Sequence, residues 1–341
     1  MSSNDRLSPL DTSFLHLEDE QTHMHVASVM IFDGPAPTYE EFLERVDSRL
    51  HLVPRYRQKL ALVPFGQGRP RWVDDDEFDL RYHVRSGALP KPRSEYELQV
   101  LAGRVFSQQL KRDKPLWELW LVEELEGDRF AVLSKTHHAL VDGISGLDIL
   151  SVLFSEDEGK AEKRWLPEPA PPRSALLAEA IIERLTMPAE MLRPARAMLR
   201  RPQQLLASAR DGARGMASLV FDGAAPAPPS PYNPGTIGGE RRFTWVRCDL
   251  ADLKAIKNNM GGTVNDVVLT IVSRALRRHL ERRGELSKGQ TLKAFVPVSV
   301  RTEDQSGALG NQVSGMLATL PISCNDPAVC LRRISNEMQS L

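Results

Sequence analysis

The sequence predicts a mixed α/β protein with two domains. The chain has 341 residues, 41% of them hydrophobic, so it can bury a large core and exceeds the usual length of a single domain. Short β-branched runs alternate with stretches of helical periodicity in both halves, which is typical of an α/β fold. Two proline-rich stretches, at 156–174 and 224–234, separate the halves.

The domain boundaries follow these changes in composition. Residues 1–160 form the predicted N-terminal domain, which carries a His-His-x-x-x-Asp-Gly motif at 137–143. Residues 161–240 form a Pro/Arg-rich helical connection, in which Leu, Ile and Met recur at helical spacing. Residues 241–341 form the first part of the C-terminal domain.

The N-terminal domain begins with an apolar, partly β-branched strand at 26–32. A helix is expected at 38–49, because Thr38 and Glu41 have the spacing of a capping box and apolar residues recur at four-residue steps. The remaining elements predicted in this domain are a helix at 95–109, strands at 117–122 and 130–133, and a helix after Gly143 that ends near residue 155.

The C-terminal domain is predicted to begin with a strand at 242–249. Two helices follow, at 250–260 and 264–283, separated by a Gly-Gly-Thr sequence in which the glycines end the first helix and the threonine caps the second. We predict two further strands, one at 292–298 and one within 316–322.

Composition narrows the functional classes. The charges of Lys plus Arg (44) and Asp plus Glu (45) nearly cancel, so the chain has no net positive charge that would favour a nucleic-acid partner. The three cysteines form no CxxC and no positively charged apolar leader begins the chain, which predicts a cytoplasmic protein. No apolar run approaches the roughly 18 residues of a membrane span, so membrane contact is expected to be peripheral.

The His137-His138 pair, followed by Asp142-Gly143, is the strongest candidate site. A neutral imidazole within hydrogen-bond reach of an alcohol can take its proton as the oxygen attacks a carbonyl carbon, and such a base contributes roughly 100- to 10,000-fold in rate. No serine lies in a GxSxG setting and no cysteine in a nucleophile motif. Direct attack is therefore favoured over a covalent acyl-enzyme.

Simpler interpretations of these residues stay open at this point. A lone HxxxD can be a packed or capping histidine. Two adjacent histidines could bind metal, but neighbouring side chains at a strand end point to opposite faces and no HExxH or cysteine partner follows, so we expect no metal site. The acidic run 74–77 is interpreted as a solvated loop.

Several ordered motifs carry a family resemblance that extends nearly end to end. They are Ser8-Pro9-Leu10-Asp11 with Met24-His25-Val26, Trp72-Val73-Asp74 and Phe78-Asp79-Leu80 with His83-Val84-Arg85, Pro115-Leu116-Trp117, His137 to Gly143, Asn265-Asp266-Val267-Val268, and Val296-Pro297-Val298-Ser299-Val300-Arg301. With these motifs the sequence resembles the bacterial wax ester synthase/diacylglycerol acyltransferases, including the mycobacterial triacylglycerol synthases. It departs from their pattern at Lys111 and His23.

The resemblance implies the CoA-dependent acyltransferase fold shared with chloramphenicol acetyltransferase. In that fold, two similar α/β domains meet at a central tunnel that contains the catalytic histidine. Relatives usually continue well past the point that corresponds to residue 341. We therefore expect the second domain to be incomplete in this chain, and the sequence leaves open whether the chain is active without the remainder.

The resemblance also assigns roles to residues. It implies that His138 is the general base, that His137 supports it, and that Asp142 is structural, holding its loop through an arginine for which Arg301 is a candidate. The other residues expected to shape the site are Gly143, Asn265, Asp266, Pro115 and Trp117. Asp266 could equally serve only the first turn of its helix, with Asn265 packed against the tunnel.

The implied reaction is O-acyl transfer from acyl-CoA, as co-substrate with no bound cofactor, to diacylglycerol, giving triacylglycerol. Long-chain alcohols are a second candidate acceptor, giving wax esters. The expected location is cytoplasmic, peripheral at the inner membrane or a lipid-body surface. The alternative is a non-catalytic or condensation-domain-like relative acting on a carrier-bound acyl or peptidyl group. Acceptor preference, acyl chain length, oxyanion-hole donors and oligomeric state are left open by the sequence.

Overall fold

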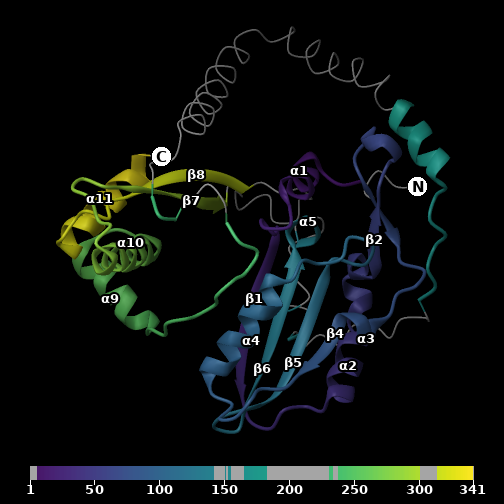
Figure 1. The fold of residues 1–341 in the computed structure, drawn as a ribbon, viewed down its shortest axis with the longest axis horizontal. Helices are drawn as coiled ribbons and strands as arrows, with labels where there is room; N and C mark the ends of the chain where they lie inside the picture. The colour runs from purple at the N-terminus through teal and green to yellow at the C-terminus, as the bar shows by residue number, and fades with distance from the viewer. Residues whose placement is uncertain are drawn as a thin grey trace. The chain divides into compact units, whose positions relative to one another are not determined.

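The computed structural model describes residues 6–141, 150, 153–154, 165–182, 230–232, 237–299 and 313–340. These residues form two compact units, and each is described by itself. Unit 1 contains the described residues up to 182 together with 238–244, and unit 2 contains those of 245–299 and 313–340 with 230–232 and 237. Helices and strands occur in both units (Figure 1), as the sequence predicts.

A four-stranded sheet with the order β1-β6-β5-β4 forms the centre of unit 1. Its strands are β1 (His25–Asp33), β4 (Val84–Gly87), β5 (Trp117–Leu125) and β6 (Arg129–His137). β6 pairs antiparallel with both β1 and β5, whereas β4 pairs parallel with β5. The three strands predicted in this half are confirmed, and β6 extends to the first histidine of the pair.

Helices α2 (Tyr39–Asp47) and α4 (Glu95–Ser107) pack on the sheet of unit 1 (Figure 1). Thr38 and Glu41 form the predicted capping box, in which the threonine hydroxyl accepts the Glu41 N–H and the carboxylate accepts the Thr38 N–H. The apolar face of α2 packs with the inward residues of β5 and β6 in one core. Both predicted helices are confirmed, and each ends two residues early.

The remaining elements of unit 1 are short. α1 (Pro9–Leu17) precedes β1, and α5 (His138–Val141) follows β6 directly. The others are the hairpin of β2 (Gln58–Ala61) and β3 (Arg71–Asp74), α3 (Leu80–His83), and the 3₁₀ turns Leu50–Leu52, Pro54–Arg57 and Pro64–Gly66.

The beginning of the predicted connection packs against unit 1. Residues 173–182 are helical, and Leu176 and Ala180 are buried against Val63. Glu179 forms ion pairs from this helix to Arg6 and Arg71. The rest of the predicted connection lies outside the described residues, and the three-part division of the chain at 160 and 240 stays a prediction.

The strand predicted at 242–249 is wrong, because this stretch forms no strand pairing in the described structure. Phe243 instead packs edge-on against Phe106 of α4, with ring centroids 5.1 Å apart. The Arg241 N–H donates to the Ser107 hydroxyl at 2.6 Å. A side chain at Gly103 would put its Cβ 2.9 Å from the Arg241 carbonyl oxygen, so a glycine there admits the crossing segment. At Phe243 the apolar side chain therefore serves packing on a helix.

Unit 2 consists of α9 (Leu250–Met260), α10 (Val264–Arg283), β7 (Leu292–Ser299), β8 (Val313–Leu320) and α11 (Pro327–Ser340). The two strands pair antiparallel, and their apolar residues form a core with α10 and α11. The two helices predicted at 250–260 and 264–283 and the two strands predicted at 292–298 and within 316–322 are confirmed. Within the described part of the chain, no helix is long and apolar enough to cross a membrane.

Candidate active site around the histidine pair

The two histidines lie at the junction of a strand and a helix. His137 is the last residue of β6 and His138 the first residue of α5. The His137 N–H donates to the Leu116 carbonyl oxygen at 2.9 Å, and the His138 N–H donates to the Met24 carbonyl oxygen at 2.9 Å. The backbone of the pair is therefore bonded to the residues that precede β5 and β1.

The His138 ring is half-buried and stacks on Phe14 of α1, with ring centroids 4.8 Å apart and planes at 26°. α1 begins at a capping box in which the Asp11 N–H donates to the Ser8 hydroxyl at 3.0 Å and the Asp11 carboxylate accepts the Ser8 N–H at 3.3 Å. Pro9 occupies the first turn, where its fixed φ suits a helix start. The Ser8-Pro9-Leu10-Asp11 motif thus starts the helix that carries Phe14.

His137 is almost fully buried, with 1% of its surface exposed. Its Nδ1 accepts the Ala139 N–H at 3.1 Å, which places the proton of the neutral ring on Nε2. Nε2 lies 3.6 Å from Oε2 of Glu18. That distance is too long for a good hydrogen bond, so the contact is mainly electrostatic. The ring faces the protein interior, in agreement with a supporting role.

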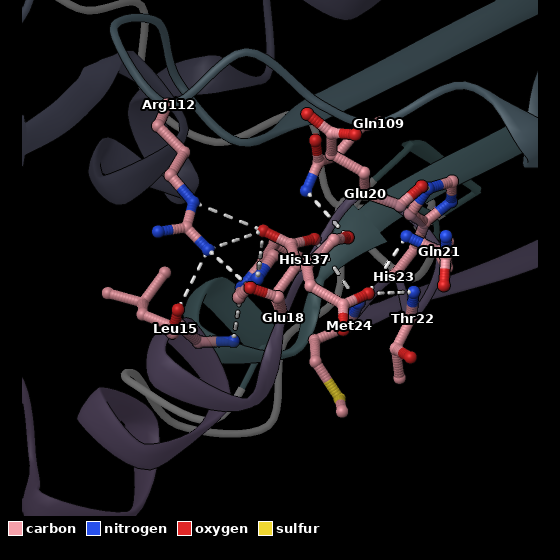
Figure 2. Close-up of polar contacts among 12 residues, drawn as sticks. Leu15, Glu18, Glu20, Gln21, Thr22, His23, Met24, Gln109, Arg112 and His137 are labelled. Atoms are coloured by element: carbon pink, nitrogen blue, oxygen red, sulfur yellow. Dashed lines mark hydrogen bonds and ion pairs between the residues drawn. The ribbon is translucent and has the colours of Figure 1, made fainter. Parts of the chain in front are cut away.

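Glu18 follows the last turn of α1, and its side chain is 1% exposed. Oε1 accepts the Met24 N–H at 3.2 Å, and Oε2 accepts from Nε and Nη2 of Arg112 at 3.2 and 3.0 Å (Figure 2). Burial raises the pKa of Glu18, but the interactions with His137, Arg112 and Met24 together outweigh burial and lower the pKa to about 2. The carboxylate is therefore charged at neutral pH.

Arg112 links Glu18 to the helix before it. Its Nη2 also donates to the Leu15 carbonyl oxygen at 2.7 Å, near the end of α1 where the helix leaves acceptors unsatisfied (Figure 2). Sequence reasoning missed Phe14, Glu18 and Arg112. Glu18 stands within the region of the first family motif, but nothing in its local sequence indicates that it meets Arg112 and His137, which are far away along the chain.

The end of α4 is tied to the same corner of the sheet by a buried lysine. Lys135 is fully buried on β6, two residues before His137, and its Nζ donates to the Val105 and Gln108 carbonyl oxygens at 3.0 and 2.9 Å. Burial lowers the pKa of Lys135. The carboxylate of Glu118, whose Oε2 lies 3.4 Å from Nζ, partly opposes this shift. Residues two apart on a strand share a face, so Lys135 and His137 both project toward the side of α4.

Trp117 begins β5 beside the end of β6 where the histidine pair stands, and Pro115 lies two residues before this strand. Trp117 is fully buried, pairs with Thr136 in β6, and donates its indole N–H to the Tyr56 carbonyl oxygen at 2.7 Å. His83 stacks on the Trp117 ring at 4.7 Å, and its Nδ1 donates to the Trp117 carbonyl oxygen at 2.8 Å. Burial lowers the pKa of His83 to about 4. These contacts fit an architectural role.

Asn265 and Asp266 lie at the start of α10 in unit 2. Asp266 is buried and forms a capping box with Thr263, whose N–H donates to Asp266 Oδ2 at 2.8 Å while the Asp266 N–H donates to the threonine hydroxyl at 3.1 Å. Asn265 is exposed on this unit. The geometry supports a helix-starting role for Asp266. Asp142, Gly143 and Arg301 lie outside the described residues, so their predicted roles stay predictions.

The acidic run at 74–77 differs from the predicted solvated loop. Asp75 is fully buried, 2.7 Å from the Lys59 ammonium and 3.9 Å from that of Lys114. This ion pairing explains how a charged side chain enters the interior. In the described ranges, no group of three or more His, Cys, Asp or Glu residues is arranged to hold a metal ion.

Chemically, unit 1 presents the half-buried imidazole of His138, whose backbone N–H is hydrogen-bonded, beside a neighbour that faces a buried charged carboxylate. Nearby histidines are held in structural contacts. His25 Nε2 donates to the Phe106 carbonyl oxygen at 3.0 Å, and burial lowers its pKa to about 4. A half-buried, neutral imidazole can accept a proton from a hydroxyl group that reaches it.

Comparisons with known proteins agree with this chemistry. Residues 7–268 match the family model of the wax ester synthase/diacylglycerol acyltransferase catalytic domain. A Mycobacterium tuberculosis protein named probable diacylglycerol O-acyltransferase tgs1 is 33% identical over 334 residues, covering 97% of this chain and 70% of that protein. The tgs2 protein of the same species is 34% identical over 349 residues, covering 98% of this chain and 73% of that protein.

Two solved structures are similar in fold. The wax ester synthase/diacylglycerol acyltransferase from Marinobacter aquaeolei superimposes with a TM-score of 0.64 at 27% identity, covering 98% of this chain and 72% of that chain. The first condensation domain of the calcium-dependent antibiotic synthetase superimposes with a TM-score of 0.55 at 16% identity, covering 100% of this chain and 75% of that one. The predicted chloramphenicol acetyltransferase-like fold class is confirmed.

Proposed function

The chain belongs to the wax ester synthase/diacylglycerol acyltransferase family and is an acyltransferase, and from this premise we propose that it transfers a long-chain acyl group from acyl-CoA to the hydroxyl of diacylglycerol, with His138 as general base. The observation that carries the assignment of the base is the placement of the His138 ring. It is half-buried on Phe14 at the start of α5, whereas its neighbour His137 is directed inward to Glu18.

The proposed reaction is a direct acyl transfer. His138 takes the hydroxyl proton as the acceptor oxygen attacks the thioester carbonyl carbon, forming a tetrahedral oxyanion. The oxyanion collapses, the carbon–sulfur bond breaks, and the protonated imidazole returns its proton to the leaving thiolate. The products are triacylglycerol and free CoA, and His138 is neutral again.

The acceptor is proposed on chemical grounds and on the names of the relatives. Diacylglycerol and a long-chain alcohol each present a hydroxyl on a hydrophobic molecule, so one base serves both. The mycobacterial relatives are named for diacylglycerol, and the family model names both wax ester synthase and diacylglycerol acyltransferase activities. We therefore propose triacylglycerol as the main product in lipid biosynthesis, with wax esters as a second product.

We also propose that the protein works at a lipid surface, because its acceptor is insoluble in water. The arginine-bearing connection at 174–221 is the segment proposed to attract an anionic membrane, where each basic residue near the surface contributes about 1 kcal/mol. Flotation with anionic liposomes tests this location. Unchanged flotation after deletion of the segment would show that the segment does not mediate membrane contact.

The experiment that tests the function measures CoA release from palmitoyl-CoA, with either diolein or hexadecanol as acceptor. His138→Ala is expected to lower kcat by about 100- to 10,000-fold with either acceptor, because both reactions need the same base. His16→Ala is the matched control, since His16 is an exposed histidine on α1. Wild-type rates in a folded His138→Ala protein would refute the proposed mechanism, and the ratio of the two acceptors defines the preferred product.

A further inference from the structure

We propose that Glu18 is a positioning residue for the transfer reaction: its two carboxylate oxygens hold the backbone of His138 from both sides and fix the tautomer of His137. The proposal rests on the role of His138 proposed above. It goes beyond the motif itself, because Glu18 lies outside the His-His-x-x-x-Asp-Gly sequence and reaches it only through the fold (Figure 2).

One oxygen of Glu18 acts through Met24. Oε1 accepts the Met24 N–H at 3.2 Å, and the Met24 carbonyl oxygen accepts the His138 N–H at 2.9 Å. The carboxylate therefore holds Met24, whose carbonyl oxygen accepts the backbone N–H of His138. Loss of Oε1 would remove this acceptor from the Met24 N–H and so loosen the residue whose carbonyl oxygen accepts the His138 N–H.

The other oxygen acts through His137. Oε2 faces Nε2 at 3.6 Å, while Nδ1 on the opposite side of the ring accepts the Ala139 N–H at 3.1 Å. Because a backbone N–H can only donate, Nδ1 must carry the lone pair and Nε2 the proton. The opposite tautomer would set two N–H groups against each other at Ala139 and a lone pair against the Glu18 carboxylate. The carboxylate therefore favours the one tautomer that bonds to the residue after His138.

Arg112 stabilises this arrangement in a buried place. The side chains of Glu18 and His137 are both 1% exposed, so their interaction is poorly screened, and a lone buried carboxylate would be costly. Arg112 donates two hydrogen bonds to Oε2 and keeps the carboxylate charged. The pKa of Glu18, lowered to about 2, agrees with a charge that persists at any pH where the enzyme works.

The substitution Glu18→Gln separates positioning from packing. The new side chain has nearly the same shape, and its amide oxygen can still accept from Met24, but its NH₂ group would then face the Nε2–H of His137 and the Nε–H and Nη2–H donors of Arg112. The variant therefore removes both the preference for the tautomer and the two hydrogen bonds from Arg112, and it leaves the volume nearly unchanged. Glu20→Gln is the matched control, because Glu20 is exposed two residues further along the chain.

The test combines histidine NMR with kinetics. In protein labelled with ¹⁵N-histidine, long-range ¹H–¹⁵N correlations report which ring nitrogen carries the proton, and loss of one set of peaks in His137→Gln assigns His137. In the wild type we expect His137 to be the Nε2–H tautomer. In Glu18→Asp we expect at most a partial loss of that tautomer. In Glu18→Gln we expect a shift toward Nδ1–H, with kcat lowered about 10- to 100-fold and KM for acyl-CoA nearly unchanged.

Two results would overturn the proposal. One is an Nδ1–H tautomer of His137 in the wild type, a measurement that does not depend on the folding of any variant. The other is wild-type kcat in a folded Glu18→Gln protein. Failure of the proposed function would look different, because His138→Ala would then retain activity whatever tautomer His137 adopts.

Discussion

Glu18 in unit 1 and Asp266 in unit 2 are both buried carboxylates, but their partners lie at very different distances along the chain. Asp266 accepts from Thr263, three residues before it, and the pair only starts α10. Glu18 contacts Arg112 and His137, which are brought to it by the fold. A local capping box stabilises one helix end, whereas the Glu18 contacts join α1, the segment before β1 and the candidate base.

This difference predicts where the protein is vulnerable. Buried ionisable groups of unit 1 depend on tertiary contacts, so changes there should disturb both stability and the candidate site. The capping box of unit 2 depends on its own helix turn, so changes there should be mild and local.

The largest expected effect is acid destabilisation of unit 1 through His83. Its folded pKa is lowered to about 4 by burial, against an ordinary value of 6.5. Because the unfolded chain takes up the proton first, the stability is fully present above pH 6.5 and is lost as the pH falls toward 4, by about 3 kcal/mol. Hydrogen exchange should show β5 amides losing protection from about pH 7 to 4.5. A His83→Gln protein whose unfolding free energy depends on pH as steeply as that of the wild type would contradict this prediction.

A smaller effect is expected from Arg112→Met. Removal of the guanidinium leaves the Glu18 carboxylate buried without its main partner, but Arg112 is 40% exposed and water can partly replace it. We expect a loss of about 2 kcal/mol in unfolding free energy, measured by urea titration. Arg81→Met is the control: its pair with Glu40 is exposed on both sides and screened by water, so it should cost clearly less stability than Arg112→Met. Equal losses of unfolding free energy in the two variants would show that the Glu18–Arg112 contact matters no more than an exposed ion pair.

The smallest effect is expected from Thr263→Ala in unit 2. Loss of the capping hydroxyl should cost about 1 kcal/mol of stability, because one N–H at the start of α10 loses its acceptor. The ¹⁵N signals of His137 should be unaffected. A change in its tautomer would show that the two carboxylates are coupled and that the contrast between them is wrong.

The same contrast explains what the sequence could predict. Elements defined by neighbours in sequence are confirmed: Thr38 and Glu41 cap α2, and the glycines before Thr263 end α9. Errors occur where tertiary packing decides the outcome. In the stretch predicted as a strand at 242–249, Phe243 packs on α4 and no strand pairing forms, and Asp75 is buried because Lys59 reaches it from β2.

The candidate site divides in the same way. The histidine pair is visible in the sequence because both residues and their spacing lie in one motif, and the structure places His138 half-buried and His137 inside. Glu18 is not visible, since a single glutamate after a short helix has no distinguishing pattern. The pairing of β1 with β6, which sets His25 opposite His137, and the stacking of Phe14 on His138 bring α1 to the motif.

A double-mutant cycle between Glu18→Gln and His138→Ala tests most directly whether Glu18 acts through the base. CoA release from palmitoyl-CoA with diolein would be measured for the wild type, both single variants and the double variant. If Glu18 only positions His138, the glutamine substitution slows the wild type about 10- to 100-fold but slows His138→Ala by less than about twofold. An equal slowing in both backgrounds would show that Glu18 acts independently of His138 and would contradict the account.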